Sequence, residues 1–572
     1  MSRPVGAAKA RADTIKTPTA RAYTPRSTEL GSNRWHWDRD QLFASGALTL
    51  GELLAFIPGV TLLSTGFILA PQVAAWYGDV GHLRIYVDGI EIDPIAVRNG
   101  GVSDLAMQPM WALEDVVAER SAGELRVHLR TYRVERTTPM TRTDVLTGSE
   151  NTNLYRGYFG KRQGNGAVFQ FAGQQFSTVS RGGLDGDALG AMVRLGWAAG
   201  RWDIDATLLR QGATRNSGAR FLTTNPQLNA MPPLNGSESV AYLRVAWGDP
   251  ETDGPWAQAI ASALSASTTH STSGQSGAAP PISSGTIAAD SVDTTTVRSQ
   301  YVLAAGMTRW GLRLSTTERI RSIRGKAYIS PGLRAEFDTR LLTLSAFGEQ
   351  GVDSTTRADL LARVSPVSWF SLSGSVSRAA PKSAALGPPA TASRLEAGLR
   401  WRDRWFTGGM VRRSASRLAA PVELDTALRA INAPATTGTT FSLRGPLALG
   451  WALDLDVVNW GAPGPYRPQT QAHSRLLFES SFPGKFPRGN FHVLAAGMYD
   501  YRSMISVPLG TNPLGQSAAA AGVYSTLLEI RIGSAVISWQ NRNIAGLPYE
   551  TFPGYLMPRL TNIYGLRWNF WN

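Results

Sequence analysis

The sequence contains no cysteine and only six histidines. The lack of cysteine excludes disulfides, thiolate metal sites and cysteine nucleophiles. The histidines are thinly scattered, which argues against a histidine-built metal site, so no cofactor is expected. Charged residues make up 17% of the chain, below the roughly 25% of soluble domains.

The chain also lacks high hydropathy. Hydrophobic residues are 43% of the total, yet the mean hydropathy is -0.14. Low charge without high hydropathy is typical of apolar residues that are spread singly along the chain. Transmembrane barrels have this composition because lipid-facing and lumen-facing residues alternate along each strand. Large soluble β-proteins can share it.

No stretch near the start resembles a secretory signal peptide. The first residues, MSRPVGAAKARADTIKTPTARAYTPR, are basic and polar and have no apolar core. If the protein is exported by the usual route, we expect that the given chain is mature, truncated or started at the wrong position. Residues 1–46 are predicted to form a flexible arm.

No uninterrupted apolar run is long enough for a membrane-spanning helix. The uncharged stretch from Leu53 to Gly78 contains Pro58, Gly59 and Pro71, and proline breaks helix interiors. A short helix over 49–56 is predicted instead. Thr49 would be its N-cap, and Glu52 would complete a capping box.

Basic residues outnumber acidic ones, 57 to 43, which gives a net charge of +14. Such a charge can indicate nucleic acid, an anionic membrane surface or anionic ligands as partners. The arginines are dispersed and no nucleic-acid-binding module is visible. An anionic surface or ligand is therefore favoured over nucleic acid.

Residues 47–133 predict a small α+β domain. Asp88-Gly89 lies between two alternating runs, which is a strong hairpin signal. The segment 112–133 then predicts two further short strands.

Residues 134–572 predict a large antiparallel transmembrane β-barrel of about 22 strands. Apolar and polar residues alternate with a period of two, and tryptophans mark many strand ends, as in interfacial aromatic girdles. In the last strand, the alternation predicts lipid contact for Tyr564, Leu566, Trp568 and Phe570, with Arg567 and Asn569 facing the lumen. This strand is expected to close the barrel against the first one. The Ser/Thr/Gly/Pro-rich segment 267–296 is predicted to be a long loop.

Three motifs occur in order ahead of this alternating region. They are TLGELLAFIPGV, with Pro58, Gly59 and Val60; RIYVDGIEI, with Asp88 and Gly89; and ALEDVVAERSAGE, with Glu114, Glu119 and Arg120. Together they resemble the plug domain of TonB-dependent outer-membrane receptors. The ending PGYLMPRLTNIYGLRWNF resembles the closing hairpin of that family.

The resemblance implies an all-β protein of the bacterial outer membrane, in which the plug domain (47–133) obstructs the lumen of the barrel (134–572). It also implies energy-coupled uptake of a scarce solute, such as a ferric siderophore, by a monomer that performs no chemistry on the solute. An inner-membrane TonB-type protein would be the partner. DTIKTPTA resembles the coupling box of the family at Asp13, Thr14, Ile15, Thr19 and Ala20. Such a box adds a strand to a partner's sheet; the alternative is a disordered basic arm.

The ligand is not specified by the sequence. Arginines at lumen-facing positions are candidates for binding an anionic solute: Arg194, Arg244, Arg400, Arg531 and Arg567. They can equally pair with carboxylates of the plug and barrel, because lumen walls are polar in any case. Haem uptake would need a histidine such as His82 or His270.

Three other classes stay open. The first is a porin-like barrel with a vestigial, uncoupled plug. The second is an outer-membrane hydrolase, which needs a nucleophile beside a base, and neither G-x-S-x-G nor H-E-x-x-H is present. The segment 184–190, LDGDALG, can hold calcium but is more often a polar turn. The third class is a soluble adhesive β-protein, against which the tryptophan-ended strands argue.

Overall fold

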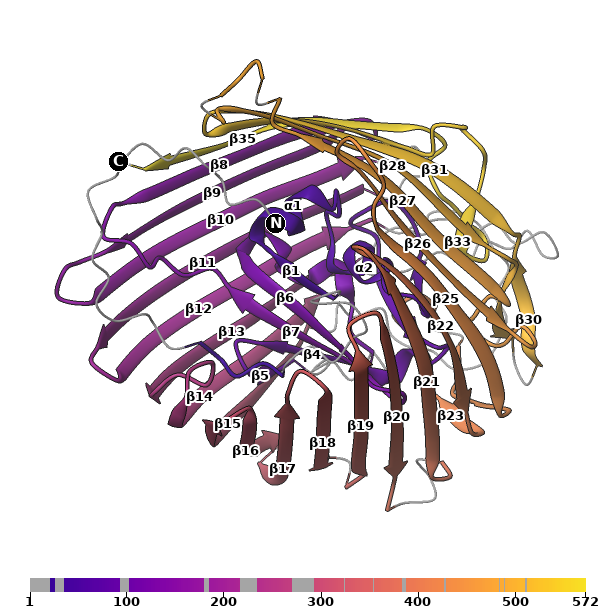
Figure 1. The fold of residues 1–572 in the computed structure, drawn as a ribbon, viewed down its shortest axis with the longest axis horizontal. Coiled ribbons are helices and arrows are strands. Elements are labelled where there is room, and N and C mark those ends of the chain that lie inside the picture. The colour runs from indigo at the N-terminus through magenta and orange to yellow at the C-terminus, as the bar shows by residue number, and fades with distance from the viewer. Residues whose placement is uncertain are drawn as a thin grey trace.

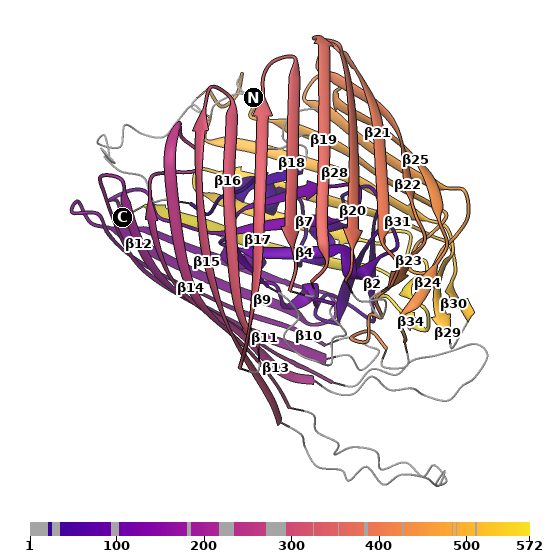
Figure 2. The same cartoon turned by 90° about the horizontal axis from the view of Figure 1, so that it is seen from below.

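A computed structural model describes residues 21–25, 35–92, 102–179, 185–216, 234–269, 293–323, 325–352, 354–382, 387–425, 428–482, 484–487, 489–509 and 512–571. Within these residues, 22 strands form one closed antiparallel barrel. A small α+β domain made from the N-terminal part of the chain lies inside the ring of strands (Figures 1 and 2). The predicted fold class and strand number are confirmed.

Sequential strands of the barrel pair with one another all the way around. The strands are β8 (Met140–Gly148), β9 (Thr152–Arg162), β10 (Ala167–Val179), β11 (Asp185–Ala199), β12 (Trp202–Arg215), β13 (Leu234–Trp247), β14 (Gly254–Thr269), β15 (Asp293–Arg309), β16 (Leu312–Ile323), β17 (Lys326–Asp338), β18 (Leu342–Gln350), β19 (Thr356–Val367), β20 (Phe370–Ala380), β21 (Ala390–Trp401), β22 (Arg404–Arg413), β25 (Thr436–Pro446), β26 (Trp451–Trp460), β27 (Thr470–Ser480), β28 (Phe491–Arg502), β31 (Ala521–Ile532), β32 (Ala535–Arg542) and β35 (Thr561–Trp571).

The last strand closes the barrel as predicted. β35 pairs with β32 on one side and with β8 on the other, where Leu566 lies opposite Val145. Tyr564, Leu566 and Trp568 are 54%, 44% and 42% exposed on the outer face. Arg567 points inward and approaches Glu529 on β31 to 3.4 Å. The barrel therefore has no free strand edge in this region.

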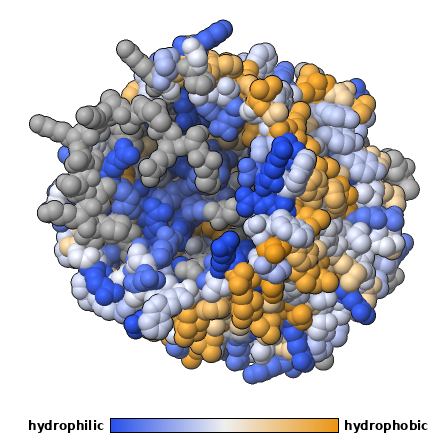
Figure 3. All heavy atoms as spheres, viewed as in Figure 1, coloured by the Kyte–Doolittle hydropathy of each residue, from blue (hydrophilic) through white to orange (hydrophobic). Residues whose placement is uncertain are grey.

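Alternation places apolar side chains outside and polar side chains inside. On β12, Ile204 and Leu208 are exposed outside, whereas Asp203, Asp205 and Thr207 are buried inside. Figure 3 shows hydrophilic residues in the hollow centre and hydrophobic residues around much of the outer margin on this face. An outer belt of this kind would be an aggregation hazard in water.

The two ends of the barrel differ. At the turn end, tight turns such as 200–201, 310–311 and 402–403 join the strands, and β8 begins and β35 ends there. Exposed tryptophans cluster at this end: Trp197, Trp202, Trp310, Trp369, Trp401, Trp451 and Trp568. At the loop end, the connections are longer and contain the extra hairpins β23–β24 (Ser416–Leu418, Ile431–Ala433), β29–β30 (Ile505–Leu509, Asn512–Ala518) and β33–β34 (Glu550–Phe552, Tyr555–Leu556).

We name the α+β domain inside the barrel, residues 35–133, the luminal domain. Its five-stranded sheet has the order β1 (His36–Asp38), β6 (Leu113–Arg120), β7 (Leu125–Thr131), β4 (Leu83–Val87) and β5 (Ile90–Glu91). A separate hairpin of β2 (Val60–Ser64) and β3 (Gln72–Trp76) points toward the loop end. Two short helices, α1 (Arg39–Ala44) and α2 (Leu50–Leu54), precede this hairpin.

Local sequence explains these elements. Thr49 caps α2 as predicted by accepting a hydrogen bond from the Glu52 backbone N–H at 3.3 Å. The Glu52 carboxylate accepts a hydrogen bond from the backbone N–H of Leu48 at 2.8 Å, whereas the predicted capping box would use the backbone N–H of Thr49. Asp88 and Gly89 have φ values of 48° and 86° and form the predicted turn between β4 and β5. Gly59 has φ 91°, and a Cβ there would meet the Tyr77 ring at 2.1 Å.

Three predictions differ from the structure. Residues 35–46 are not part of a flexible arm, because β1 pairs with β6 and Leu42 is buried in the luminal domain. The ends of the predicted loop 267–296 belong to strands, since β14 continues to Thr269 and β15 starts at Asp293, and the residues between them lie outside the described ranges. The segment 185–190 begins β11 rather than forming a turn. Among the described residues, no helix is both long and apolar enough to cross a bilayer.

Candidate functional site

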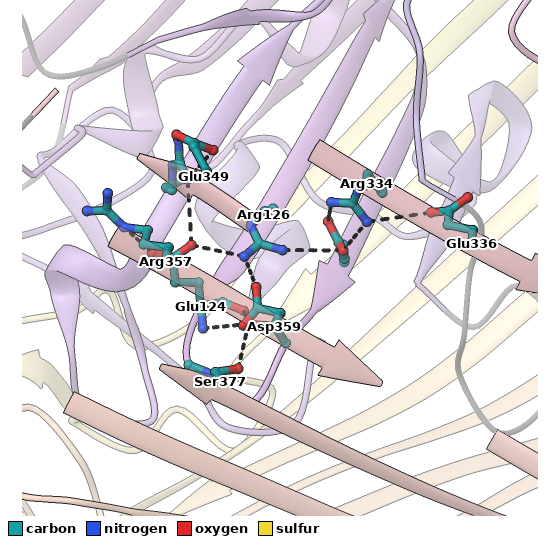
Figure 4. Close-up of polar contacts among 12 residues, drawn as sticks. Glu124, Arg126, Arg334, Glu336, Glu349, Arg357, Asp359 and Ser377 are labelled. Carbon is teal, nitrogen blue, oxygen red and sulfur yellow. Dashed lines mark hydrogen bonds and ion pairs between the residues drawn. The ribbon is translucent and has the colours of Figure 1, made fainter. Parts of the chain in front are cut away.

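Charged side chains join the luminal domain to one wall of the barrel. Arg126 on β7 is buried between Glu119, Glu124 and Asp359 of the barrel strand β19 (Figure 4). Arg334 on β17 binds Glu119 through both carboxylate oxygens at 2.7 and 3.0 Å. Separating the two partners would leave buried charges unpaired. Each such pair therefore fixes the position of the domain.

The same pattern continues along this wall. Arg84 bridges Glu91 of its own hairpin and Glu349 of β18, at 2.7 Å from each carboxylate. Further pairs between the luminal domain and β11–β22 are Arg133–Asp205, Arg120–Glu396, Arg357–Glu124, Arg321–Glu91, Arg215–Asp104 and Arg413–Asp79. We name the strands β11–β22 the anchoring wall.

The family-like Asp88-Gly89 turn is held by this wall. The Asp88 carboxylate accepts from Arg194 at 3.1 Å and from the Tyr242 hydroxyl at 2.8 Å. Arg194 also donates to the Thr131 hydroxyl at 2.5 Å and is 2% exposed. The turn that the sequence identified is therefore a docking point between domain and barrel.

The ion pairs determine the protonation of the carboxylates in the luminal domain. Burial alone would raise the pKa of Glu119, but Arg334 and Arg126 hold it well below its usual range. Burial opposes ionisation of Glu124 too, yet Arg357, Arg84 and Arg126 lower its pKa to about 2. Burial raises the pKa of Glu114, even with Arg21 at 3.4 Å. The domain is thus anchored by carboxylates that stay charged.

The remaining motif residues have structural contacts. Pro58, Gly59 and Val60 are buried where α2 leads into β2, and Gly59 O accepts from the Tyr77 backbone N–H at 2.9 Å. Arg120 pairs with Glu396 and lies over the Trp35 ring. The predicted coupling box, 13–20, lies outside the described residues together with its five matching positions, as does His270.

The five lumen arginines do not form one site. Arg194 and Arg244 are buried, and Arg244 pairs with Asp205 at 2.5 Å. Arg400 lies at the turn end of β21, where it pairs with Asp403 at 3.0 Å and is 44% exposed in its side chain. Arg531 approaches Asp40 to 4.0 Å, and Arg567 lies 4.4 Å from the Phe43 ring of α1. Arg567 borders a cavity that also has Arg156, which the sequence did not single out.

The wall opposite the anchoring wall is formed by β27–β35, and its contacts are of another kind. Barrel side chains donate to backbone carbonyls of residues 44–64: Arg475 to Ala44 O at 2.5 Å, Gln540 and Arg542 to Gly46 O at 3.1 Å each, Gln471 to Val60 O at 2.7 Å, and Thr551 to Ser64 O at 3.0 Å. Arg542 also pairs with Glu52 at 2.5 Å.

Two cavities lie along this opposite wall. The lateral cavity, about 250 Å³, lies toward the loop end and is lined by Glu52, Phe56, Tyr501, Arg502, Arg542 and Tyr549 among others. The inner cavity, about 50 Å³, is lined by Phe43, Asp144, Arg156, Glu529 and Arg567. Both include Gly46, Ala47 and Gln540 in their linings, so these three residues separate them.

Histidine and carboxylate positions do not favour a metal or haem site in the described part of the chain. No group of three or more His, Asp or Glu side chains there could hold a metal ion. His82 is bonded to Arg413 at 2.9 Å and lies 3.4 Å from Asp79. His82 therefore belongs to the ion pairs of the anchoring wall.

Solved structures named as transporters or receptors share this architecture. The FrpB iron transporter from Neisseria meningitidis matches with a TM-score of 0.67 at 12% identity, over 92% of this chain and 97% of that chain. The siderophore receptor PirA from Acinetobacter baumannii matches with a TM-score of 0.68 at 12% identity, over 94% and 98%. The copper transporter OprC matches with a TM-score of 0.67 at 13% identity, over 92% and 97%. No protein-family model and no curated protein matches the sequence.

Proposed function

We propose, from the premise that this chain has the fold of the TonB-dependent receptors, that it is an outer-membrane receptor for the energy-coupled uptake of a scarce solute. FrpB and OprC are named as transporters and PirA as a siderophore receptor. Those names give the class of function. The solute of this chain has to be inferred from its own residues.

The observation that carries the proposal is the way the lumen is filled. A wide barrel without its luminal domain would be an open pore, as in large barrels generally. Here a folded domain occupies the lumen, and hairpins of the loop end pack over its β2–β3 apex in one buried cluster that includes Val73, Leu418, Tyr466, Ile505 and Phe552. A pore that is filled by a separate domain can pass a solute only when that domain moves.

The outer surface supports insertion in a lipid bilayer. Exposed Leu, Val, Ile and Phe side chains alternate with inward polar residues on the barrel strands, and exposed tryptophans mark the turn end. Aromatic residues prefer the interface between membrane and water. The turn end, where the barrel strands begin and finish, would face the periplasm, and the longer loops would face outward.

Coupling requires a partner on the periplasmic side. The described segment 21–25 lies against the turn-end half of the lumen, where Tyr23 stacks on Trp256 and Arg130 donates to Ala22 O. The residues 13–20 precede this segment directly. The position of segment 21–25 therefore supports coupling from the turn end, the side from which an inner-membrane TonB-type protein would pull.

Planar-bilayer conductance tests this proposal. The whole chain should be nearly closed, and a variant without residues 1–133 should form a large, steadily open pore, because the domain that fills the lumen is absent. Two equally open pores would instead indicate a porin-like barrel with a loose domain. Refolded protein that forms no pore in either version would refute the membrane barrel.

A further inference from the structure

Two arginines of the inner cavity region, Arg39 and Arg156, form no ion pair within the described residues. Arg142 pairs with Asp144 at 2.6 Å, and Arg567 pairs weakly with Glu529 at 3.4 Å. Within the described ranges, Arg39 donates only to the carbonyl of Leu113, and Arg156 donates only to the Gln174 side chain. Four guanidinium groups therefore share two carboxylates. Charges enclosed in a protein are normally paired, because an unpaired one loses its hydration without compensation.

The arginines surround one aromatic ring. The guanidinium groups of Arg142, Arg567 and Arg39 lie 3.8, 4.4 and 5.9 Å from the centre of the Phe43 ring. Burial and the charge of Arg142 lower the pKa of Arg39 to about 10. Arg39 therefore remains protonated at neutral pH, although its surroundings disfavour the charged form. An anion placed here would relieve the repulsion among the arginines.

The space for an anion lies beside Arg156. The inner cavity borders Arg156, Arg567, Asp144 and Glu529, and its volume of about 50 Å³ exceeds what one water needs. Beyond Gly46 and Gln540, the lateral cavity adds about 250 Å³ lined by Phe56, Tyr501 and Tyr549 as well as polar groups. A cavity of about 150 Å³ already accommodates a benzene ring.

We propose that the inner and lateral cavities together form the binding site of a small organic anion, with its charged group beside Arg156 and Arg567 and its body in the lateral cavity. This inference rests on the proposed uptake function and names the class of its solute. The solute would contact the barrel wall of β8, β9 and β27–β35 and residues 43–72 of the luminal domain. The anchoring wall would not contact it, because the arginines there already have carboxylate partners.

A matched set of probes tests the charge requirement on the whole chain in detergent micelles. Benzoate, benzyl alcohol and benzylamine share one ring and carry a negative, a neutral and a positive group. Calorimetric titration should show benzoate binding at least about tenfold more tightly than benzyl alcohol, and benzylamine binding least. Equal affinities, or no benzoate binding up to about 10 mM, would overturn the proposal.

Variants locate the site. Arg156→Gln should weaken benzoate binding roughly tenfold and leave benzyl alcohol unchanged, whereas Arg156→Lys, which keeps the charge, should largely retain benzoate. Arg400→Gln is the matched control, because Arg400 lies near the turn end of β21 with a partly exposed side chain and does not line either cavity. Equal loss in the Arg156→Gln and Arg400→Gln proteins would show that the cavity is not the site. Circular dichroism of each variant separates misfolding from loss of affinity.

The two proposals can fail separately. Charge-selective benzoate binding in a chain whose lumen is open with and without residues 1–133 would contradict the uptake function and keep the anion site. A closed whole chain that opens on truncation, but binds the three probes equally, would support the uptake function and contradict the anion site.

Discussion

At the scale of the residue, the side of the barrel that a position faces decides its environment. Leu566 and Arg567 are neighbours on β35, yet Leu566 is 44% exposed on the outer face and Arg567 approaches Glu529 in the lumen. Because side chains alternate strictly along a strand, these facings cannot be exchanged without shifting the register. The outer face of β35 adjoins the outer faces of β8 and β32, so Leu566 lies within a continuous apolar surface.

Leu566→Arg should therefore reduce membrane insertion. A charged residue on the lipid face near the midplane costs about 2–4 kcal/mol, and the yield of folded barrel in lipid vesicles should fall accordingly. Leu449→Arg is the control, because Leu449 is 92% exposed on the turn between β25 and β26, outside the strands. Gel-shift assays of folded protein measure both yields. If the two variants insert equally well, β35 does not face lipid at Leu566.

Single residues also show where sequence reasoning ends. The alternation correctly predicted that Arg194 faces inward and that Asp88-Gly89 forms a turn. It left open whether Arg194 binds a solute or a carboxylate, and the structure pairs it with Asp88. That partner depends on how the luminal domain is rotated inside the barrel, which no local pattern encodes. Arg156 was missed for the same reason, because an unpaired charge is visible only when its neighbours are known.

At the scale of the element, the luminal domain is held unequally. Its sheet strands β6 and β7 carry buried ion pairs such as Arg334–Glu119, whereas residues 44–64 are held largely through backbone carbonyls and the Glu52–Arg542 pair. The segment also borders both cavities, so its barrel-facing side has open space beside it. Regions with fewer packed contacts open more readily. Residues 44–64 are therefore expected to be the first part of the domain to move.

Hydrogen exchange tests this difference. Amides of 44–64 should exchange faster than those of Leu113–Thr131 in the whole chain. Glu52→Gln replaces a charged hydrogen bond worth about 1.5 kcal/mol, so exchange in 44–64 should rise roughly tenfold. Glu119→Gln is the matched change on the anchoring wall and should act on β6 and β7 instead. Mass spectrometry of peptides resolves the two regions, and a uniform rise in both variants would mean that the domain opens as one unit.

The elements also show why one domain boundary was missed. Residues 1–46 are rich in Pro, Thr, Arg and Ala, which suggested an arm, but β1 adds a strand to β6 and Asp38 forms a capping box with Gln41 for α1. A three-residue strand has too few positions to show a period of two. The position of β1 is decided by the exposed edge of β6, far along the chain. The barrel strands are long enough to show a period of two over many positions, and they were predicted well.

At the scale of the whole molecule, the charges inside the lumen make the closed state depend on pH. Arginines lower the pKa values of Asp88, Glu91, Glu119 and Glu124 against the effect of burial, the last to about 2. A carboxylate whose pKa falls on folding stabilises the folded state above its unfolded pKa of about 4 and loses that contribution as the pH falls through its folded pKa. Glu114, whose pKa burial raises, acts in the opposite direction.

Within the luminal domain, four carboxylates with lowered pKa values against one with a raised pKa predict acid opening of the lumen. The whole chain should stay closed in a planar bilayer from about pH 7 to about pH 5, and its conductance should rise progressively between about pH 4 and about pH 2. The backbone hydrogen bonds of the closed barrel do not titrate, so the variant without residues 1–133 should keep a constant open conductance over the same range. Opening on raising the pH, or the same acid response in the truncated barrel, would show that the ion pairs of the anchoring wall do not hold the luminal domain in place.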